Sequence, residues 1–275
     1  MTTLSGIPVL FLVAGRGARL APLTDDQPKS LIPFLGKPLL EWQLDTLRHV
    51  GLTEFNLICG YRSERFAVYG FPQWFNARWR KTNMVYTLLC ARRFLEECDA
   101  LIVAYGDIVY EPKVVETLLG TPGDVVVAID RNWRALWELR SENPLDDAET
   151  LRVNDLGHIV DIGRKPSGYD EIEAQYIGLV KFSRAGLERL AQVYDAPETA
   201  DNSWTDGRGR EQAYMTDLLR GVIASGMPVT AAPFDGGWLE VDTLDDLQRY
   251  EDLYEAGLLK EFYTPHQTGA VPNNS

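Results

Sequence analysis

The chain has 275 residues, of which 45% are hydrophobic and 24% are charged, and its formal net charge is −13 at pH 7. This length and composition allow an ample core in one large domain or two small ones. The negative charge argues against nucleic acid or an anionic membrane as a partner, and no apolar run is long enough to span a bilayer.

The cysteines and the first residues indicate the cellular compartment. Cys59, Cys90 and Cys98 have neither the spacing of a zinc site nor that of a disulfide framework. Residues 1–6 lack the basic and apolar regions of a signal peptide. We therefore expect a reduced, cytoplasmic protein.

Strand and helix patterns alternate through the first half of the chain, which favours a mostly parallel sheet flanked by helices, a Rossmann-like α/β fold. Helix signals include a proline in the first turn and a closing glycine, and the strand signals are short apolar runs. Strands are predicted at residues 9–13, 55–59, 100–105 and 125–129, and helices at residues 38–51 and 83–97.

The pattern changes in the second half, where shorter strands predict a small β-rich part. A hairpin is predicted from residues 151–153 and 158–162, and residues 195–210 are expected to form a long loop or lid. Further strands are predicted at 175–182, 229–232 and 238–241, and helices at 185–193, 211–224 and 244–254. We expect one continuous domain over residues 1–257 and a frayed tail over 258–275.

A glycine-bearing loop follows the first strand and is the strongest functional signal. Gly15 and Gly17 allow a tight turn that brings backbone N–H groups close to a ligand. Arg16, Arg19 and Lys29 add positive charge in an otherwise acidic chain. The loop is therefore predicted to bind phosphate, although it is neither a dinucleotide fingerprint nor a P-loop, which argues against a Rossmann-type dehydrogenase.

Carboxylates at two places suit a divalent metal. Asp107 directly follows the apolar strand 100–105, at the edge where open α/β sheets bind ligands. Glu240 and Asp242 lie two residues apart on a predicted strand, so both side chains point to one face. Carboxylates near bound phosphates favour Mg²⁺. Asp107 is also compatible with a turn, and Asp242 with the N-cap of the last helix.

The loop motifs resemble those of a known family. Residues 14–20, 22–24 and 28–33 read Ala-Gly-Arg-Gly-Ala-Arg-Leu, Pro-Leu-Thr and Pro-Lys-Ser-Leu-Ile-Pro. They resemble the N-terminal signature of nucleotidyltransferases, which join an NTP to a sugar phosphate or an alcohol phosphate and release pyrophosphate. The resemblance implies the nucleotidyltransferase fold. It also implies that Arg19 and the loop, with Ala14, Gly15, Arg16 and Gly17, hold the nucleotide phosphates, and that Lys29 reaches the α-phosphate.

Other segments are most similar to the phosphocholine cytidylyltransferase-like branch, which includes 2-aminoethylphosphonate cytidylyltransferases. The segments that carry this similarity are residues 81–88, 105–108, 128–133, 146–149, 175–178 and 214–217, together with Trp137 and Arg140. The likeness implies CTP as the nucleotide, Asn83 near its base, and Asp107 and either Asp242 or Glu240 as Mg²⁺ ligands. In the sugar-phosphate members the acidic ligand directly follows Trp-Leu, which favours Glu240, whereas the alcohol-phosphate motif favours Asp242.

The resemblance also implies an acceptor site. Lys165 of an Asp-Ile-Gly-Arg-Lys-Pro segment is expected to contact the acceptor's phosphate. Aromatic faces with a carboxylate bind a choline-like cation, and the candidates are Trp133, Trp137, Tyr176 and Asp217. Ala174 stands where glycine is usual, so phosphocholine, 2-aminoethylphosphonate and hydroxyalkylphosphonates all remain open.

The sequence as a whole predicts a Mg²⁺-dependent cytidylyltransferase. Its expected partners are CTP and a small phosphate or phosphonate acceptor, with no nucleic acid and no membrane, and a homodimer is left open. The first alternative is a hexose-1-phosphate nucleotidyltransferase, whose long glycine-rich sugar-binding segments are not found here. The second is an inactive regulatory subunit, which the presence of Arg19, Lys29 and Asp107 disfavours.

Overall fold

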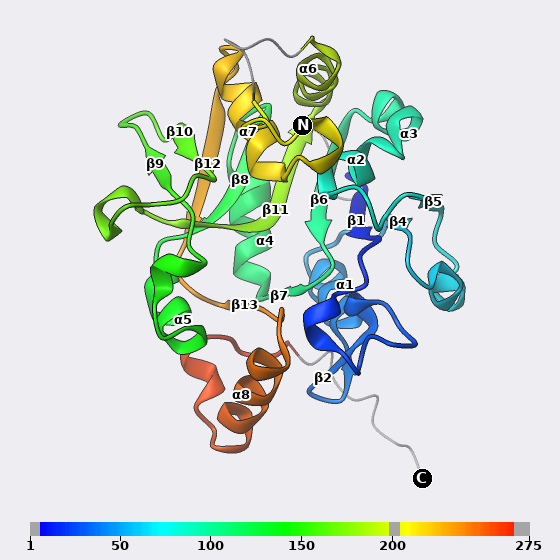
Figure 1. Cartoon of the computed structure of the whole chain (residues 1–275), viewed down its shortest axis with the longest axis vertical. Coiled ribbons are helices and arrows are strands. Elements are labelled where there is room, and N and C mark those ends of the chain that lie inside the picture. Colours follow the sequence, from blue (N-terminus) through cyan, green and yellow to red (C-terminus); the bar gives the residue numbers. More distant parts are fainter. Residues whose placement is uncertain (1–5, 198–203, 267–275) are drawn as a thin grey trace.

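A seven-stranded sheet forms the centre of the computed structural model, which describes residues 6–197 and 204–266 (Figure 1). The strand order is β12-β8-β11-β6-β1-β4-β5. In chain order these strands are β1 (Val9–Val13), β4 (Phe55–Cys59), β5 (Gln73–Phe75), β6 (Ala100–Tyr105), β8 (Val125–Asp130), β11 (Gln175–Ser183) and β12 (Val229–Phe234). Every pairing is parallel except the two that β11 makes. The predicted mostly parallel sheet is confirmed.

Both faces of the sheet are buried, because side chains alternate between two apolar clusters. On β1, Phe11 belongs to one cluster and Leu10 to the other. The first cluster includes the apolar faces of α1 (Leu39–His49) and α4 (Pro112–Gly120). The second includes those of α2 (Met84–Leu89), α3 (Arg92–Glu97), α6 (Arg184–Asp195) and α7 (Met215–Ala224). The helices therefore flank the sheet as predicted.

The helix predicted over residues 83–97 is divided into α2 and α3. Ala91, at the break, leaves the helical backbone conformation, and its N–H bonds to the carbonyl of Leu88 three residues back. Leu88, Ala91 and Leu95 all stay buried on the same face of the sheet. The apolar spacing was therefore predicted correctly, while the single continuous helix was wrong.

Three short strand pairs lie outside the central sheet in the described residues. The predicted hairpin is confirmed as β9 (Leu151–Val153) and β10 (Ile159–Ile162). A second pair joins β7 (Ile108–Tyr110) to β13 (Trp238–Glu240) in antiparallel register. A third joins β2 (Pro33–Phe34) to β3 (Lys37–Pro38). Helices α5 (Trp133–Arg140) and α8 (Leu244–Glu255) lie together at one end of the molecule (Figure 1).

The chain beyond residue 257 is packed where fraying was expected. Leu259 and Tyr263 are 2% and 0% exposed and belong to the same core cluster as α1 and α4. They lie four residues apart, so a short helical turn points both inward. The predicted frayed tail is therefore wrong for residues 258–263. Its last part, residues 267–275, and residues 198–203 of the predicted lid lie outside the described residues.

Candidate active site

The glycine loop turns at the carboxyl end of β1, next to Lys29. Gly17 has a φ of 73°, and a Cβ at this position would lie 2.8 Å from the Cβ of Lys29. Only glycine allows both this backbone conformation and this close approach. The Thr24 hydroxyl donates to the carbonyl of Gly17 at 3.0 Å and closes the loop. The loop thus places Lys29 against its backbone, as expected for a phosphate-binding turn.

Lys29 is held between two carboxylates from distant parts of the chain. Its Nζ lies 2.7 Å from Asp107 Oδ2 and 2.6 Å from Asp242 Oδ1. Burial alone lowers the pKa of Lys29, but the two carboxylates outweigh it, so the pKa is raised and the ammonium is charged. The three residues, which the sequence assigned to one site, are therefore in direct contact.

Strand pairing explains how residues so far apart meet. Asp107 lies in the turn between β6 and β7, and β7 pairs with β13. The Val241 N–H continues this ladder by donating to the carbonyl of Asp107 at 2.9 Å. The carboxylate of Asp242 therefore lies beside that of Asp107, at the carboxyl edge of the parallel strands.

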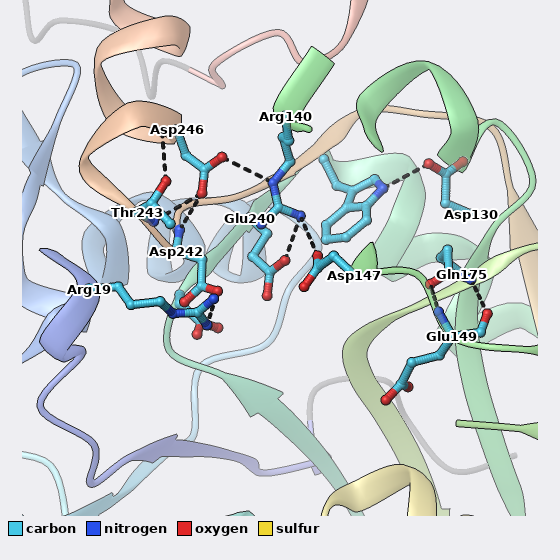
Figure 2. Close-up of polar contacts among 12 residues, drawn as sticks. Arg19, Asp130, Arg140, Asp147, Glu149, Gln175, Glu240, Asp242, Thr243 and Asp246 are labelled. Atoms are coloured by element: carbon cyan, nitrogen blue, oxygen red, sulfur yellow. Dashed lines mark hydrogen bonds and ion pairs between the residues drawn. The ribbon is translucent and has the colours of Figure 1, made fainter. Parts of the chain in front are cut away.

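The two loop arginines behave differently. Arg19 forms an ion pair with Asp242 from a largely exposed position, so its guanidinium lies at the candidate site (Figure 2). Burial opposes ionisation of Asp242, yet Lys29 and Arg19 hold its pKa below the ordinary value. Arg16 instead bonds to Asp25 Oδ1 at 2.6 Å. Its charge is thus already balanced by the loop's own carboxylate.

Glu240 and Asp242, which the sequence left as alternatives, have different partners. Glu240 Oε2 lies 2.7 Å from a terminal nitrogen of Arg140, which is 8% exposed. Arg140 also contacts Asp246, and Asp246 caps α8 through the N–H groups of Asp242 and Thr243 (Figure 2). Burial, only partly offset by Arg140, raises the pKa of Glu240 to about 7. Both carboxylates are thus paired with cations, but Asp242 shares Lys29 with Asp107, whereas Glu240 is paired with the structural Arg140.

The carboxylates fit a magnesium ion that also binds substrate. Asp107 Oδ1 is buried and has no hydrogen-bond partner among the described residues. Over residues 6–197 and 204–266, no three His, Cys, Asp or Glu side chains lie close enough to hold a metal by themselves. Magnesium typically takes only one or two carboxylates and completes its shell with water and phosphate oxygens. Asp107 and Asp242 meet that requirement.

Two cavities meet at this cluster. The first, here called the loop cavity, has a volume of about 170 Å³ and is lined by Leu12, Ala14, Gly15, Trp79, Thr82, Asn83, Met84, Thr87, Tyr105, Gly106 and Asp107. The second, here called the carboxylate cavity, has a volume of about 240 Å³ and is lined by Arg19, Met84, Tyr105, Trp137, Asp147, Glu149, Gln175, Tyr176, Ile177, Gly178, Tyr214, Thr216, Trp238, Glu240 and Asp242. Met84 and Tyr105 form a wall shared by both.

Four of the six residues that the sequence assigned to the nucleotide line the loop cavity, namely Ala14, Gly15, Asn83 and Asp107. Arg16 and Gly17 do not line it. Asn83 also caps α2, since its side-chain oxygen accepts from the Met84 N–H at 2.9 Å. Its position at the cavity wall is therefore fixed by the start of a helix.

Only two of the four expected acceptor residues reach the carboxylate cavity. Trp137 and Tyr176 line it, whereas Trp133 is 3% exposed and packs against Trp137 and Tyr169 in the core. Asp217 is fully buried and is paired with Arg208 and Arg220. These two expectations are corrected: α5 directs Trp133 inward, and Arg208 and Arg220 already balance the charge of Asp217.

Lys165 lies apart from both cavities. Its Nζ contacts the carbonyl oxygens of Leu145 and Asp146, the latter at 2.7 Å. These carbonyls directly precede Asp147, which lines the carboxylate cavity. In the described structure Lys165 therefore holds the segment beside the cavity, and it does not line the cavity itself.

Sequence reasoning missed several residues that build the site. Glu149 lines the carboxylate cavity, and the buried carboxylate of Asp130 accepts from the Trp238 indole at 2.8 Å, which fixes β13 (Figure 2). Glu149, Asp130 and Arg140 were noticed only as parts of motifs, without a role of their own. Two sequence signals could have indicated them: the acidic run at residues 146–149, which contains Glu149, and Asp130 at the end of the apolar run 125–129.

Comparison with known proteins agrees with this fold and identifies the family. Residues 9–201 match the model of the MobA-like NTP transferase domain, and the chain belongs to that family. Its fold is the nucleotidyltransferase fold.

One relative is a CTP:phosphoglutamine cytidylyltransferase from Campylobacter jejuni, 36% identical over 248 residues that cover 87% of this chain and 97% of the relative. Two solved structures share the fold. The CTP:phosphocholine cytidylyltransferase of Streptococcus pneumoniae is 20% identical with a TM-score of 0.66, and the match covers 90% of this chain and 99% of that one. The inositol-1-phosphate CTP transferase of T. maritima is 20% identical with a TM-score of 0.69, and the match covers 94% and 98%.

In the described part of the chain, no helix has the length and apolar character needed to cross a bilayer.

Proposed function

We propose that this protein is a Mg²⁺-dependent cytidylyltransferase that joins CTP to a small acceptor bearing a phosphate or phosphonate and releases pyrophosphate. The observation that carries the proposal is the position of Lys29. Its ammonium bridges Asp107 of the loop cavity and Asp242 of the carboxylate cavity. A charged lysine between the two cavities suits a reaction in which the phosphate of an acceptor attacks the α-phosphate of a nucleotide.

The chemistry follows from this placement. An oxygen of the acceptor's phosphate forms a bond to the α-phosphorus of CTP while the bond to pyrophosphate breaks. Such transfers depend on positioning and on neutralisation of charge. Bound Mg²⁺ would neutralise phosphate oxygens beside Asp107 and Asp242. Lys29 would exchange its carboxylate partners for the α-phosphate and the incoming phosphate, and Arg19 and the loop N–H groups would hold the β- and γ-phosphates.

Three findings support the cytidylyl and acceptor parts of the proposal. A relative that matches nearly the whole chain is named for CTP and phosphoglutamine. Asn83 lines the loop cavity, where the base would lie. The carboxylate cavity has room only for a small acceptor. Phosphoglutamine, phosphocholine and 2-aminoethylphosphonate are therefore candidate acceptors.

We also propose a cytoplasmic location, which agrees with the free thiols of Cys59, Cys90 and Cys98.

The test is pyrophosphate release with CTP, Mg²⁺ and a panel of acceptors. The panel holds phosphoglutamine, phosphocholine, phosphoethanolamine, 2-aminoethylphosphonate, 2-hydroxyethylphosphonate and glucose-1-phosphate. We expect turnover with CTP and at least one of the first five. Turnover with glucose-1-phosphate alone would replace the proposal by a sugar-phosphate enzyme. No pyrophosphate release with any NTP, together with no CTP binding by calorimetry, would contradict the proposed function.

The metal part is tested separately with Asp107→Asn. This change keeps the shape of the side chain but removes the charge that would face Mg²⁺. We expect turnover at millimolar Mg²⁺ to fall at least about 100-fold and to recover partly as Mg²⁺ is raised. Asp124→Asn, a change at a strand start outside both cavities, is the control. Unchanged Mg²⁺ dependence in the Asp107 variant would remove that residue from the metal site.

A further inference from the structure

Glu149 is a carboxylate built into the wall of the carboxylate cavity. Its backbone is fixed by a reciprocal pairing with the side chain of Gln175, the first residue of β11. The Gln175 amide oxygen accepts from the Glu149 N–H at 3.1 Å, and the amide nitrogen donates to the Glu149 carbonyl at 2.5 Å. Figure 2 shows this pairing on the backbone side of Glu149, with the carboxylate directed away from it.

The side chain of Glu149 is free to bind a ligand. No hydrogen bond or ion pair reaches its carboxylate from the residues that the structure describes. Burial and the nearby Asp217 carboxylate raise the pKa of Glu149 to about 7, with Arg220 opposing them. A half-buried carboxylate without a partner is costly, and a cation that completes its contacts would remove that cost.

The charges of the other cavity residues are largely balanced. Arg140 neutralises Glu240 at 2.7 Å, and Lys29 and Arg19 neutralise Asp242. Asp147, half exposed, lies 3.8 Å from the same Arg140 nitrogen. The unbalanced charge of the cavity is therefore the negative charge of Glu149, while the cations that could contact a phosphate, Lys29 and Arg19, lie at Asp242. A zwitterion with a phosphate at one end and a cation at the other matches this distribution.

The cavity recognises hydrogen-bond donors better than it would hold a methylated cation. A quaternary ammonium needs open aromatic faces. Trp137 is only 4% exposed and is covered by the Arg140 guanidinium, 5.4 Å from its ring centroid, and by Trp133. The Tyr176 ring likewise packs edge-on against Tyr105, with 5.7 Å between the ring centroids. The oxygens of the Glu149 carboxylate accept hydrogen bonds from an N–H donor, which a quaternary ammonium lacks.

We propose that Glu149 binds the ammonium group of the acceptor, and that the enzyme is selective for acceptors with a primary ammonium over those with a quaternary one. This inference rests on the proposed function and narrows the class of acceptor to phosphates and phosphonates that carry a primary ammonium. The Asp217 carboxylate, which the sequence had indicated for this role, is already paired with two arginines. Glu149 takes its place as the residue that determines specificity.

Phosphoethanolamine and phosphocholine test the selectivity, because they differ only by three N-methyl groups. With CTP and Mg²⁺ at saturation, we expect kcat/KM for phosphoethanolamine to exceed that for phosphocholine at least about tenfold, the value of one charge-assisted hydrogen bond. Phosphoglutamine and 2-aminoethylphosphonate extend the primary-ammonium set. 2-Hydroxyethylphosphonate, which has an uncharged hydroxyl in place of the ammonium and is here called the neutral acceptor, supplies the reference for an acceptor without a cation.

Glu149→Gln tests the residue. We expect kcat/KM for the primary-ammonium acceptors to fall about tenfold to 100-fold, mainly through KM, while the KM for CTP and the rate with the neutral acceptor stay unchanged. Glu149→Asp keeps the charge and is expected to recover part of the loss. Glu142→Gln removes the same charge from an exposed position in the same segment, and it is expected to change nothing.

The outcomes separate this inference from the function on which it rests. Efficient turnover of phosphocholine or of the neutral acceptor, with no preference for primary ammonium, would overturn the inference and leave the cytidylyltransferase in place. An equal loss for charged and neutral acceptors in Glu149→Gln would overturn it too, since Glu149 would then only hold the fold. Absence of CTP binding and of all turnover would overturn both.

Discussion

Lys29 shows how a single side chain can prepare a site for anions. Without substrate its ammonium is held at 2.7 Å and 2.6 Å by two carboxylates. Those contacts keep the lysine charged and in place in a half-buried position, where a lone ammonium would be desolvated at a cost. The same carboxylates are the proposed metal ligands, so binding of metal and nucleotide would release the lysine toward phosphate.

Substitution of Lys29 is expected to affect chemistry more than folding. Lys29→Met should lower kcat by at least about 100-fold, because a preorganised positive charge beside the transferring phosphate is lost. The measurement is pyrophosphate release, with circular dichroism to check the fold. Lys37→Met is the matched control, since Lys37 also pairs with an aspartate, Asp45, but lies outside both cavities. Near-normal turnover of Lys29→Met would remove Lys29 from the reaction.

Glu149 gives a pH dependence whose sign is fixed. Its pKa rises from 4.5 to about 7 in the folded protein because of burial and the nearby carboxylates of Asp217, Asp147 and Glu240, with Arg220 opposing them. Between these two pH values the folded state holds a proton that the unfolded state has lost. The wild type should therefore lose stability relative to Glu149→Gln as pH rises from about 4.5 to 7.

The measurement for this effect is urea unfolding of both proteins at pH 4.5, 6 and 8. We expect the difference in unfolding free energy to be smallest at pH 4.5 and to reach its full size at pH 8, in favour of Glu149→Gln. A difference that does not change with pH would mean that Glu149 titrates normally in the folded state.

At the scale of elements, β11 is the strand that places residues of the proposed acceptor site. It runs antiparallel between β6 and β8, so its first residues lie at the carboxyl edge of the parallel strands. Its register with β8 shifts between Tyr176 and Val180. At Gly178, φ is 88°, and an added Cβ would lie 2.5 Å from the Tyr105 ring. This bulge aims Tyr176 into the carboxylate cavity and seats Tyr105 beside it.

Gly178→Ala is expected to disturb this arrangement. The new methyl group must displace the Tyr105 ring, which typically costs about 1–3 kcal/mol, in addition to about 1 kcal/mol for the positive φ. Gly157→Ala is the control: φ is 77° there, but no atom lies within 4 Å of the added Cβ. Denaturant unfolding of both variants measures the difference. Equal losses would show that Tyr105 can move aside freely.

The elements were predicted far better than the contacts within the site. Local apolar runs predicted β1, β6 and β8 because a buried strand needs no distant information. The break at Ala91 was missed because the apolar spacing continues across it. Trp133 and Asp217 were placed in the acceptor site from their residue types, yet whether such a side chain faces a cavity or the core depends on how α5 and α7 pack. That packing involves partners distant in the sequence.

At the scale of the whole molecule, the C-terminal segment closes one side of the core. Tyr263 is fully buried in the cluster formed with α1 and α4, although sequence position alone suggested a frayed end. A fully buried aromatic side chain contributes through its area and through contacts with many neighbours. Residues 258–263 are therefore part of the fold and not an appendage.

Tyr263→Ala is expected to lower the free energy of unfolding by about 3–5 kcal/mol, the usual range for removal of a buried aromatic side chain. Tyr254→Ala, at a position 47% exposed on α8, should cost much less. Thermal unfolding followed by circular dichroism compares the two. A similar shift of Tm for both would mean that the end of the chain contributes little to the core.

The wall formed by Met84 and Tyr105 divides the two cavities along the order of the chain. Apart from Arg19 and this wall, every residue that lines the carboxylate cavity comes from position 137 onward, whereas the loop cavity is lined only by residues up to 107. The first half of the chain therefore forms most of the loop cavity, and the second half forms most of the carboxylate cavity. If the proposed function holds, substitutions in the second half that spare Asp242 would change the acceptor while leaving the residues that bind the nucleotide intact, which makes this scaffold a suitable starting point for directed changes of product.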